Sequence, residues 1–253
     1  MIKNLIKKIF SKSITDKIRL LSLIFGNKLT YSQDCLYTTV NSDFMKDPLF
    51  IESYNKGRAL MPKSWGDYQF HWRAYVLCWA ANQTKNLDGD FVECGVNTGM
   101  FSKMIINFIN FTNKTQKNYY LLDTFNGMSE KYSTEEEMKR SEEMGYVEDI
   151  YEQVKKLFCD FKNIIIIKGA VPETLTQVNS EKISFLSIDM NCVVPEIEAM
   201  EFFWDKLAKG GIIVLDDYGF PGNDDQKKAH DNFAKSKGVL VLPLSTGQGI
   251  IIK

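Results

Sequence analysis

The regular alternation of short apolar runs with helical stretches most limits the folds open to this chain. Five such runs follow one another: Asp90–Cys94, Tyr119–Asp123, Ile164–Lys168, Ile183–Asp189 and Gly211–Asp216. Strands that alternate with helices build βαβ units and therefore a mostly parallel sheet. The four consecutive isoleucines at 164–167 indicate a strand that is covered on both faces.

The C-terminal stretch predicts two more strands, Gly238–Pro243 and Gly249–Lys253. Only the turn Ser245–Gln248 separates them, which favours antiparallel pairing. The predicted fold is therefore α/β, a doubly wound, mostly parallel seven-stranded sheet. The expected helices cover Ser64–Thr84, Phe101–Phe111, Asp149–Cys159, Glu196–Leu207 and Asp225–Ser236.

The length of 253 residues suits one α/β domain of about 180 to 200 residues with an N-terminal appendage. We expect residues 1–63 to form a helical and irregular extension and residues 64–253 to form the main domain. The net charge of −1 gives no electrostatic case for nucleic acid as a partner. The five cysteines are widely spaced, which argues against a disulfide framework and favours a reducing cytoplasm.

The N-terminus is basic and amphipathic. Between residues 2 and 19, apolar side chains recur at helical spacing while lysines and an arginine mostly fill the other face. Such a helix suits peripheral contact with an anionic membrane surface, or docking on its own domain or on a second subunit. We therefore expect a cytoplasmic homo-oligomer without a transmembrane segment, and we leave membrane association open.

The first predicted strand runs into a glycine-rich turn that suits a nucleotide-type ligand. Gly95 and Gly99 permit a tight turn before a helix, where backbone N–H groups converge. A dinucleotide fingerprint would need a glycine at Asn97, which disfavours NAD. Glu93 before the turn and Asp123 after the next strand suit a ribose and a charged amino-acid tail, and these are present in S-adenosylmethionine.

The carboxyl ends of the strands define the rest of the predicted cofactor site, because ligands of open parallel sheets bind at that edge. We expect Asp123 to accept hydrogen bonds from ribose hydroxyls, and Phe125 and Ala170 to flank an adenine ring. The predicted cofactor contacts are Glu93, Gly95, Val96, Asn97, Gly99, Asp123, Thr124, Phe125, Gly169, Ala170 and Asp189.

Four polar residues follow the fourth and fifth strands at the same edge: Asp189, Asn191, Asp216 and Asp217. Carboxylates in one crevice repel each other unless a cation lies among them. Oxygen ligands favour Mg²⁺, which can bind a substrate hydroxyl and lower its pKa. The alternative is that Asp216 and Asp217 cap the next helix or pair with lysines such as Lys227.

The segment Asn126–Glu148 is long for a connection between a strand and a helix. Connections of this length often form lids over active sites. The alternative is a charged, solvated helical excursion without a gating role. We expect this segment and residues 30–72 to cover the acceptor side of the site.

Five segments together carry a family resemblance: Gly89–Val96, Leu122–Gly127, Lys168–Leu175, Ser187–Asn191 and Gly210–Gly219. They resemble the successive motifs of the macrocin and mycinamicin sugar O-methyltransferases, a family that also resembles the enzyme that methylates the noviose sugar of novobiocin. The resemblance covers about residues 89–253. It implies a class I, Rossmann-like methyltransferase fold that uses S-adenosylmethionine, Mg²⁺ held by acids after the fourth and fifth strands, and a sugar hydroxyl as the acceptor.

One position departs from the pattern of that family. The family commonly has Asp-x-Asp at the fourth strand, and here the second acid is Asn191. An amide oxygen can bind Mg²⁺ but cannot accept a proton at neutral pH. Asp189 is therefore the first choice for the general base, and His71, on the predicted aromatic helix, is the second.

The leading hypothesis is an S-adenosylmethionine- and Mg²⁺-dependent O-methyltransferase. Its acceptor would be a sugar hydroxyl in a surface glycan, in a nucleotide- or lipid-linked sugar, or in a glycosylated metabolite. Two alternatives remain: methylation of a catechol-like phenol, and a non-catalytic protein of the same fold that binds the cofactor.

Overall fold

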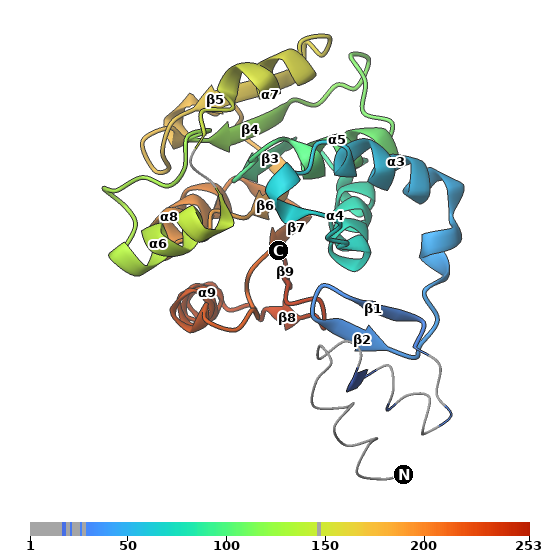
Figure 1. Cartoon of the computed structure of the whole chain (residues 1–253). Helices are drawn as coiled ribbons and strands as arrows, with labels where there is room; N and C mark the ends of the chain where they lie inside the picture. The colour runs from blue at the N-terminus through green and yellow to red at the C-terminus, as the bar shows by residue number, and fades with distance from the viewer. Residues whose placement is uncertain (1–16, 19–20, 22–25, 27–28, 146–147) are drawn as a thin grey trace.

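The computed structural model describes residues 17–18, 21, 26, 29–145 and 148–253 (Figure 1). The predicted basic amphipathic helix lies almost entirely outside these residues. Among the described helices, none has both the length and the apolar character that a membrane span requires.

In the described part of the chain, seven strands form one sheet in the order β5-β4-β3-β6-β7-β9-β8 (Figure 1). The parallel strands are β3 (Asp90–Cys94), β4 (Tyr119–Asp123), β5 (Ile164–Lys168), β6 (Ile183–Ile188) and β7 (Leu207–Leu215). Antiparallel pairing joins β9 (Gly249–Ile252) to β7 and to β8 (Leu242–Pro243). The predicted sheet and its antiparallel closing pair are confirmed.

The strand order reverses at β3, which pairs with β4 on one side and with β6 on the other. The chain moves outward from β3 to β5 and then crosses back to begin β6 beside β3. In open α/β sheets this reversal creates a crevice at the carboxyl ends of the strands. The glycine-rich turn after β3 lies at this point.

Helices cover both faces of the sheet because the strand residues that point to either face are apolar. Phe91 packs with α4 (His71–Thr84) and α5 (Met100–Phe108), whereas the next residue, Val92, packs in a second cluster with α8 (Val193–Trp204) and α9 (Asp224–Ser236). Successive side chains of a strand point to opposite faces. The short helix α7 (Tyr151–Leu157) adds Val154 to the first cluster.

Four predicted helices were too long: those predicted at 101–111 and 149–159 end a few residues early, as α5 and α7, and the other two differ for a clear structural reason. The helix predicted from Ser64 to Thr84 is a 3-10 turn, η2 (Lys63–Trp65), followed by α4 from His71, because Gly66 interrupts the helix at φ 60°. The helix predicted to end at Leu207 stops at Trp204. Leu207 instead begins β7, where it is buried and pairs with Ile183.

The described part of the predicted N-terminal extension contains several regular elements. It contains a hairpin of β1 (Tyr31–Gln33) and β2 (Leu36–Thr38), the turn η1 (Asp43–Lys46) and the helix α3 (Pro48–Arg58). Asp47 caps α3, since its carboxylate accepts from Leu49 N at 2.8 Å.

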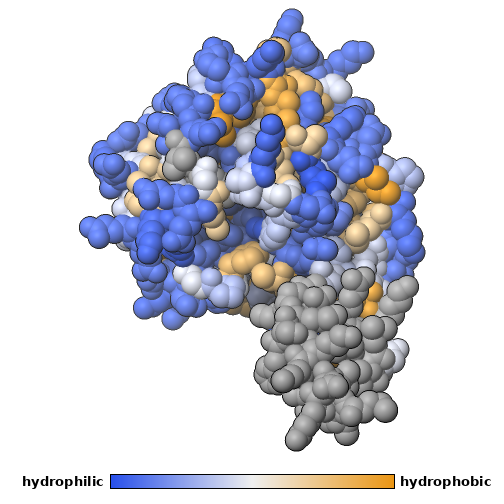
Figure 2. Space-filling model, viewed as in Figure 1, coloured by the Kyte–Doolittle hydropathy of each residue, from blue (hydrophilic) through white to orange (hydrophobic). Residues whose placement is uncertain are grey.

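The extension packs onto the main domain through α3, which lies beside α5 (Figure 1). Phe50 and Tyr54 share a core cluster with residues of both α4 and α5. Figure 2 shows that the face viewed in Figure 1 is largely hydrophilic, with hydrophobic residues in small separate groups.

Candidate active site

The glycine-rich turn is held in place by the acid at the end of the neighbouring strand. Asp123 Oδ2 accepts from Val96 N at 2.6 Å and from Asn97 N at 2.8 Å. Asn97 has φ 50°, and Gly99, at φ 79°, caps α5. The sequence therefore folds here into a turn whose backbone is tied to β4.

Asp123 organises a second turn with its other oxygen. Its Oδ1 accepts from Phe125 N at 2.6 Å, directly after β4. A carboxylate oxygen has two lone pairs, so Oδ2 is fully used by the two backbone contacts. Oδ1 also lies 3.3 Å from Thr124 Oγ1, with which a ligand hydroxyl would compete. The binding of ribose hydroxyls by Asp123 stays a prediction. The structure adds a second role for Asp123, which is to order both turns.

Glu93 lies inside the protein rather than on the surface of the crevice. It is 2% exposed, and its Oε2 accepts from Ser102 Oγ at 2.8 Å and from the hydroxyl of Tyr119. Burial raises the pKa of Glu93 to about 7. The residue ties α5 to β3 and β4, and its predicted contact with the cofactor stays a prediction.

Phe125 also differs in placement from what we expected. It is 1% exposed at φ 53°, and its ring centroid lies 5.6 Å from that of Tyr151. Stacking on an adenine would require this ring to leave the core. Gly169 and Ala170 begin the turn after β5, where Gly169 N donates to the carbonyl of Asp123 at 2.9 Å.

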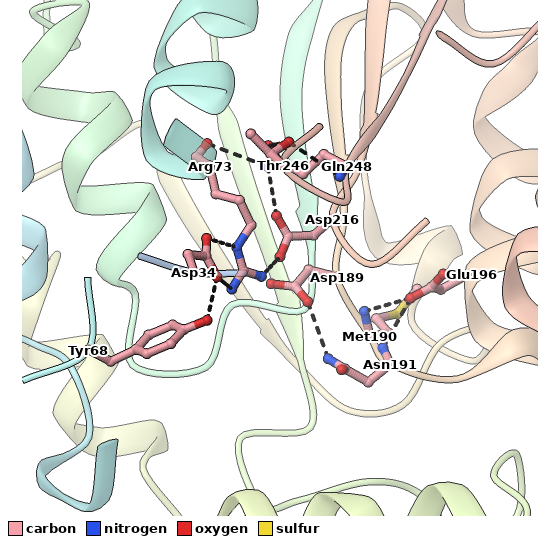
Figure 3. A network of polar contacts seen from close by, with 10 residues as sticks. All are labelled: Asp34, Tyr68, Arg73, Asp189, Met190, Asn191, Glu196, Asp216, Thr246 and Gln248. Atoms are coloured by element: carbon pink, nitrogen blue, oxygen red, sulfur yellow. Dashed lines mark hydrogen bonds and ion pairs between the residues drawn. The ribbon is translucent and has the colours of Figure 1, made fainter. Parts of the chain in front are cut away.

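The turn after β6 presents Asp189 and Asn191 at the same edge (Figure 3). Asn191 Nδ2 donates to Asp189 Oδ1 at 3.2 Å, and Asn191 has φ 58°. Glu196, in the first turn of α8, accepts from Met190 N at 2.9 Å and from Asn191 N at 3.0 Å. The conformation that orients Asn191 is thus supported by a buried carboxylate.

His230 stands behind this turn. Its Nε2 lies 2.9 Å from Glu196 Oε2, and both side chains are almost fully buried. The ring of His230 is stacked near that of Tyr218, which follows Asp217. The sequence analysis missed Glu196 because an acid in the first turn of a helix is ordinarily a surface residue that complements the helix dipole.

Asp216 is committed to two side chains that the sequence analysis did not identify. It is 2% exposed, its Oδ2 accepts from Arg73 Nη1 at 2.8 Å, and its Oδ1 accepts from Gln248 Nε2 at 2.8 Å. The other nitrogens of Arg73 bind Asp34 (Figure 3). The partners come from α4, from the turn before β9 and from the N-terminal hairpin, so only the tertiary structure unites them.

The remaining two acids carry poorly compensated charge. Burial, and then the charges of Asp216 and Asp217, raise the pKa of Asp189 well above its ordinary value. Burial and the charge of Asp216 raise the pKa of Asp217 to about 7. Carboxylates in this situation favour a proton or a cation nearby.

Within the described residues, no three His, Cys, Asp or Glu side chains are arranged as a metal site. Both oxygens of Asp216 are engaged by Arg73 and Gln248. Asp189, Asp217 and the amide of Asn191 still match the donor chemistry of Mg²⁺, which proteins often bind through one or two carboxylates.

His71 begins α4 among aromatic side chains. Its ring stacks on Tyr54 at 4.1 Å between centroids and meets Tyr31 edge-on at 6.0 Å. Burial, with a contribution from Arg58, lowers the pKa of His71 to about 4. This environment is typical of a structural histidine, and its role as a general base stays a prediction.

The long connection after β4 contains α6 (Glu135–Met144). Glu137 Oε1 accepts from Val193 N at 3.0 Å, and Arg140 Nη1 donates to the carbonyl of Gly222 at 2.8 Å. At the other end, Trp65 Nε1 donates to the carbonyl of Met144 at 3.3 Å. The segment therefore bridges α8, the connection after β7 and the turn η2, as a cover for this edge would.

The strand order, the antiparallel β9, and the glycine-rich turn that binds the last residue of β4, Asp123, define a class I methyltransferase fold. The chain belongs to the macrocin O-methyltransferase (TylF) family, whose profile matches residues 75–245.

A curated protein is similar to about half of this chain. An 8-demethyl-8-(2,3-dimethoxy-α-L-rhamnosyl)-tetracenomycin-C 4'-O-methyltransferase of Streptomyces olivaceus is 25% identical over 138 residues, which are 51% of this chain and 53% of that protein. The match therefore spans about half the length of this curated relative.

Two solved structures share the fold. The O-methyltransferase NovP superposes with a TM-score of 0.64 at 15% identity, covering 83% of this chain and 97% of that one. The apo structure of CalS11, described as a TDP-rhamnose 3'-O-methyltransferase, gives a TM-score of 0.52 at 16% identity, covering 81% and 95%.

Proposed function

We propose that this chain is an S-adenosylmethionine-dependent O-methyltransferase whose acceptor is a sugar hydroxyl. The observation that carries the proposal is the turn at the strand reversal, where Asp123 holds the N–H groups of Val96 and Asn97 beside the edge that bears Asp189. The cofactor, when bound, supplies an activated methyl group on a sulfonium.

The chain itself has to bind the cofactor, align the acceptor oxygen with the methyl carbon and accept a proton. The turn from Gly95 to Gly99 and the carboxylate of Asp123 support the position of the cofactor. Asp189 supports proton acceptance, since a carboxyl with a raised pKa is a more effective base near neutral pH. Alignment of the acceptor oxygen with the methyl carbon then contributes several kcal/mol, on the order of known orientation effects.

We also propose that Mg²⁺ assists at this edge, held by Asp189, Asp217 and Asn191. Of the predicted ligands Asp189, Asn191, Asp216 and Asp217, only Asp216 has both oxygens engaged by an arginine and a glutamine. The ion, when bound, would lower the pKa of the acceptor hydroxyl.

A sugar acceptor is supported by the family and by the names of two relatives, both of which specify a rhamnose unit. The covering elements α6 and the N-terminal extension are where the acceptor pocket is expected. We propose that residues 1–63 act as this cover and as an oligomer contact in a cytoplasmic enzyme, with peripheral membrane contact as a further role of the N-terminal helix.

The proposal is tested in two stages. Calorimetric titration with S-adenosylhomocysteine, with and without Mg²⁺, reports cofactor binding independently of the acceptor. Transfer of a labelled methyl group is then measured with TDP-rhamnose, with a rhamnoside and with catechol. Absence of cofactor binding would refute the methyltransferase proposal, whereas transfer to catechol alone would refute the sugar acceptor.

A further inference from the structure

We propose that Arg73 occupies the place of a cation at Asp216, and that it thereby withholds this carboxylate from any divalent ion at the strand edge. This role of Arg73 rests on the proposed function, because it concerns the same strand edge that bears Asp189 and Asp217. In Figure 3, Asp216 lies near Asp189 but points toward Arg73 of α4.

The first step is the geometry of the guanidinium. Arg73 Nε and Nη2 each lie 3.0 Å from an oxygen of Asp34, and Nη1 lies 2.8 Å from Asp216 Oδ2. One planar group therefore binds one acid through two nitrogens and a second acid through the third. A lysine cannot reproduce this arrangement, because its ammonium is a single point of charge.

The second step is burial. The side chain of Arg73 is 14% exposed, and those of Asp34 and Asp216 are 2% and 3% exposed. Solvent therefore screens these interactions weakly, and each charge depends on its partners. Phe220 covers the guanidinium, with its ring centroid 4.9 Å from the central carbon of Arg73.

The third step is the way in which Asp34 reaches Arg73. Asp34 and Cys35 form the two-residue turn of the β1–β2 hairpin and have φ values of 51° and 56°. Aspartate tolerates a positive φ in such a two-residue turn, whereas this conformation is disfavoured for a cysteine. Tyr68 fixes the carboxylate further, because its hydroxyl donates to Asp34 Oδ1.

This arrangement decides which carboxylates at the strand edge are open to a divalent ion. One guanidinium is shared by the two buried carboxylates of Asp34 and Asp216, so these three side chains together carry one net negative charge. Both oxygens of Asp216 are engaged, because Gln248 takes the one that Arg73 does not. A divalent ion at this edge is then left with Asp189 and Asp217 as its carboxylate ligands.

The experiment measures Mn²⁺ affinity by electron paramagnetic resonance in the full chain. The variant D34N/R73Q removes one negative and one positive charge together, so the net charge is unchanged while Asp216 is released. We expect Mn²⁺ to bind at least about tenfold more tightly, because a third carboxylate becomes available. Equal or weaker binding than in the wild type, or no binding to either protein, would overturn the inference.

The matched control is R58Q/D67N, which removes an arginine–aspartate pair on the surface, where Asp67 is 92% exposed. This control should leave Mn²⁺ affinity unchanged. Calorimetry with S-adenosylhomocysteine on the same samples reports the proposed function separately. Loss of cofactor binding in the wild type would count against that function and not against the role of Arg73.

A second measurement decides the case if D34N/R73Q does not fold. D216N and D217N make the same chemical change at adjacent residues, and their thermal unfolding is compared without metal. We expect D216N to lower the midpoint, since Arg73 loses its partner, and D217N to raise it or leave it unchanged, since repulsion is relieved. The opposite order would overturn the inference.

Discussion

The backbone of Gly95 passes so close to that of Asp189 that a methyl group on Gly95 would lie 1.8 Å from the carbonyl oxygen of Asp189. The two residues directly follow the neighbouring strands β3 and β6, at the point where the strand order reverses. Asp189 N also donates to the carbonyl of Cys94 at 2.9 Å. The glycine-rich turn and the edge that bears Asp189 are therefore packed directly against each other as one unit.

G95A should disrupt this unit. The substitution adds overpacking of roughly 1–3 kcal/mol to the roughly 1–2 kcal/mol that a positive φ costs any residue with a Cβ. Urea unfolding measures the loss. G238A is the matched control, because Gly238 also has a positive φ, of 71°, but has nothing within 4 Å of its added methyl group. Equal losses in the two variants would show that the contact with Asp189 is unimportant.

D123A should weaken cofactor binding more than it weakens the fold. The substitution leaves the N–H groups of Val96 and Asn97 without their acceptor, and hydrogen bonds to charged groups contribute about 1.5–3 kcal/mol. Affinity for S-adenosylhomocysteine should therefore fall by roughly tenfold or more. D90A is the control, because Asp90 holds Asn118 N at the opposite edge of the sheet. An unchanged dissociation constant in D123A would mean that the ribose of the cofactor does not bind at Asp123.

E93Q should reduce the loss of stability with increasing pH. The pKa of Glu93 is raised by burial from 4.5 to about 7, so stability is fully present below pH 4.5 and is lost as the pH rises through 7. The full effect is about 3 kcal/mol, from 1.36 kcal/mol per unit of pKa shift. Glutamine keeps an oxygen for Ser102 and Tyr119 and stays neutral.

The measurement is the free energy of unfolding at pH 5 and pH 8 for wild type and E93Q. The difference between the two proteins isolates Glu93, since Asp189 and Asp217 titrate in both. We expect E93Q to gain stability relative to the wild type at pH 8. A constant difference at the two pH values would contradict the raised pKa of Glu93.

E137A should loosen the cover formed by α6. Glu137 completes a capping box with Thr134 and also binds Val193 N, so its loss removes both a helix cap and a tether. A helix cap contributes about 0.5–2 kcal/mol to stability. Its loss should therefore make proteolysis within residues 126–148 severalfold faster. E136A is the control on the same helix, because Glu136 is exposed. Equal cleavage rates in E137A and E136A would show that the contact between Glu137 and Val193 N does not hold this segment in place.

Much of the fold follows from local sequence. The five apolar runs at 90–94, 119–123, 164–168, 183–189 and 211–216 each became a parallel strand, because only a sheet covered on both faces can bury such runs. The short turn before Gly249 likewise produced the antiparallel pair. Helix boundaries were less predictable, since the start of α4 depended on the conformation of one glycine, Gly66.

The candidate site was only partly predictable. The sequence by itself determined which acids stand at the ends of the strands, because strand direction and helix alternation place Asp123, Asp189 and Asp217 at one edge. Only the tertiary structure decided that Asp216 faces Arg73 and that Asp34 completes the ion pair. These partners lie far apart along the chain, and the direction of a buried carboxylate depends on which charges the packing of other elements brings beside it.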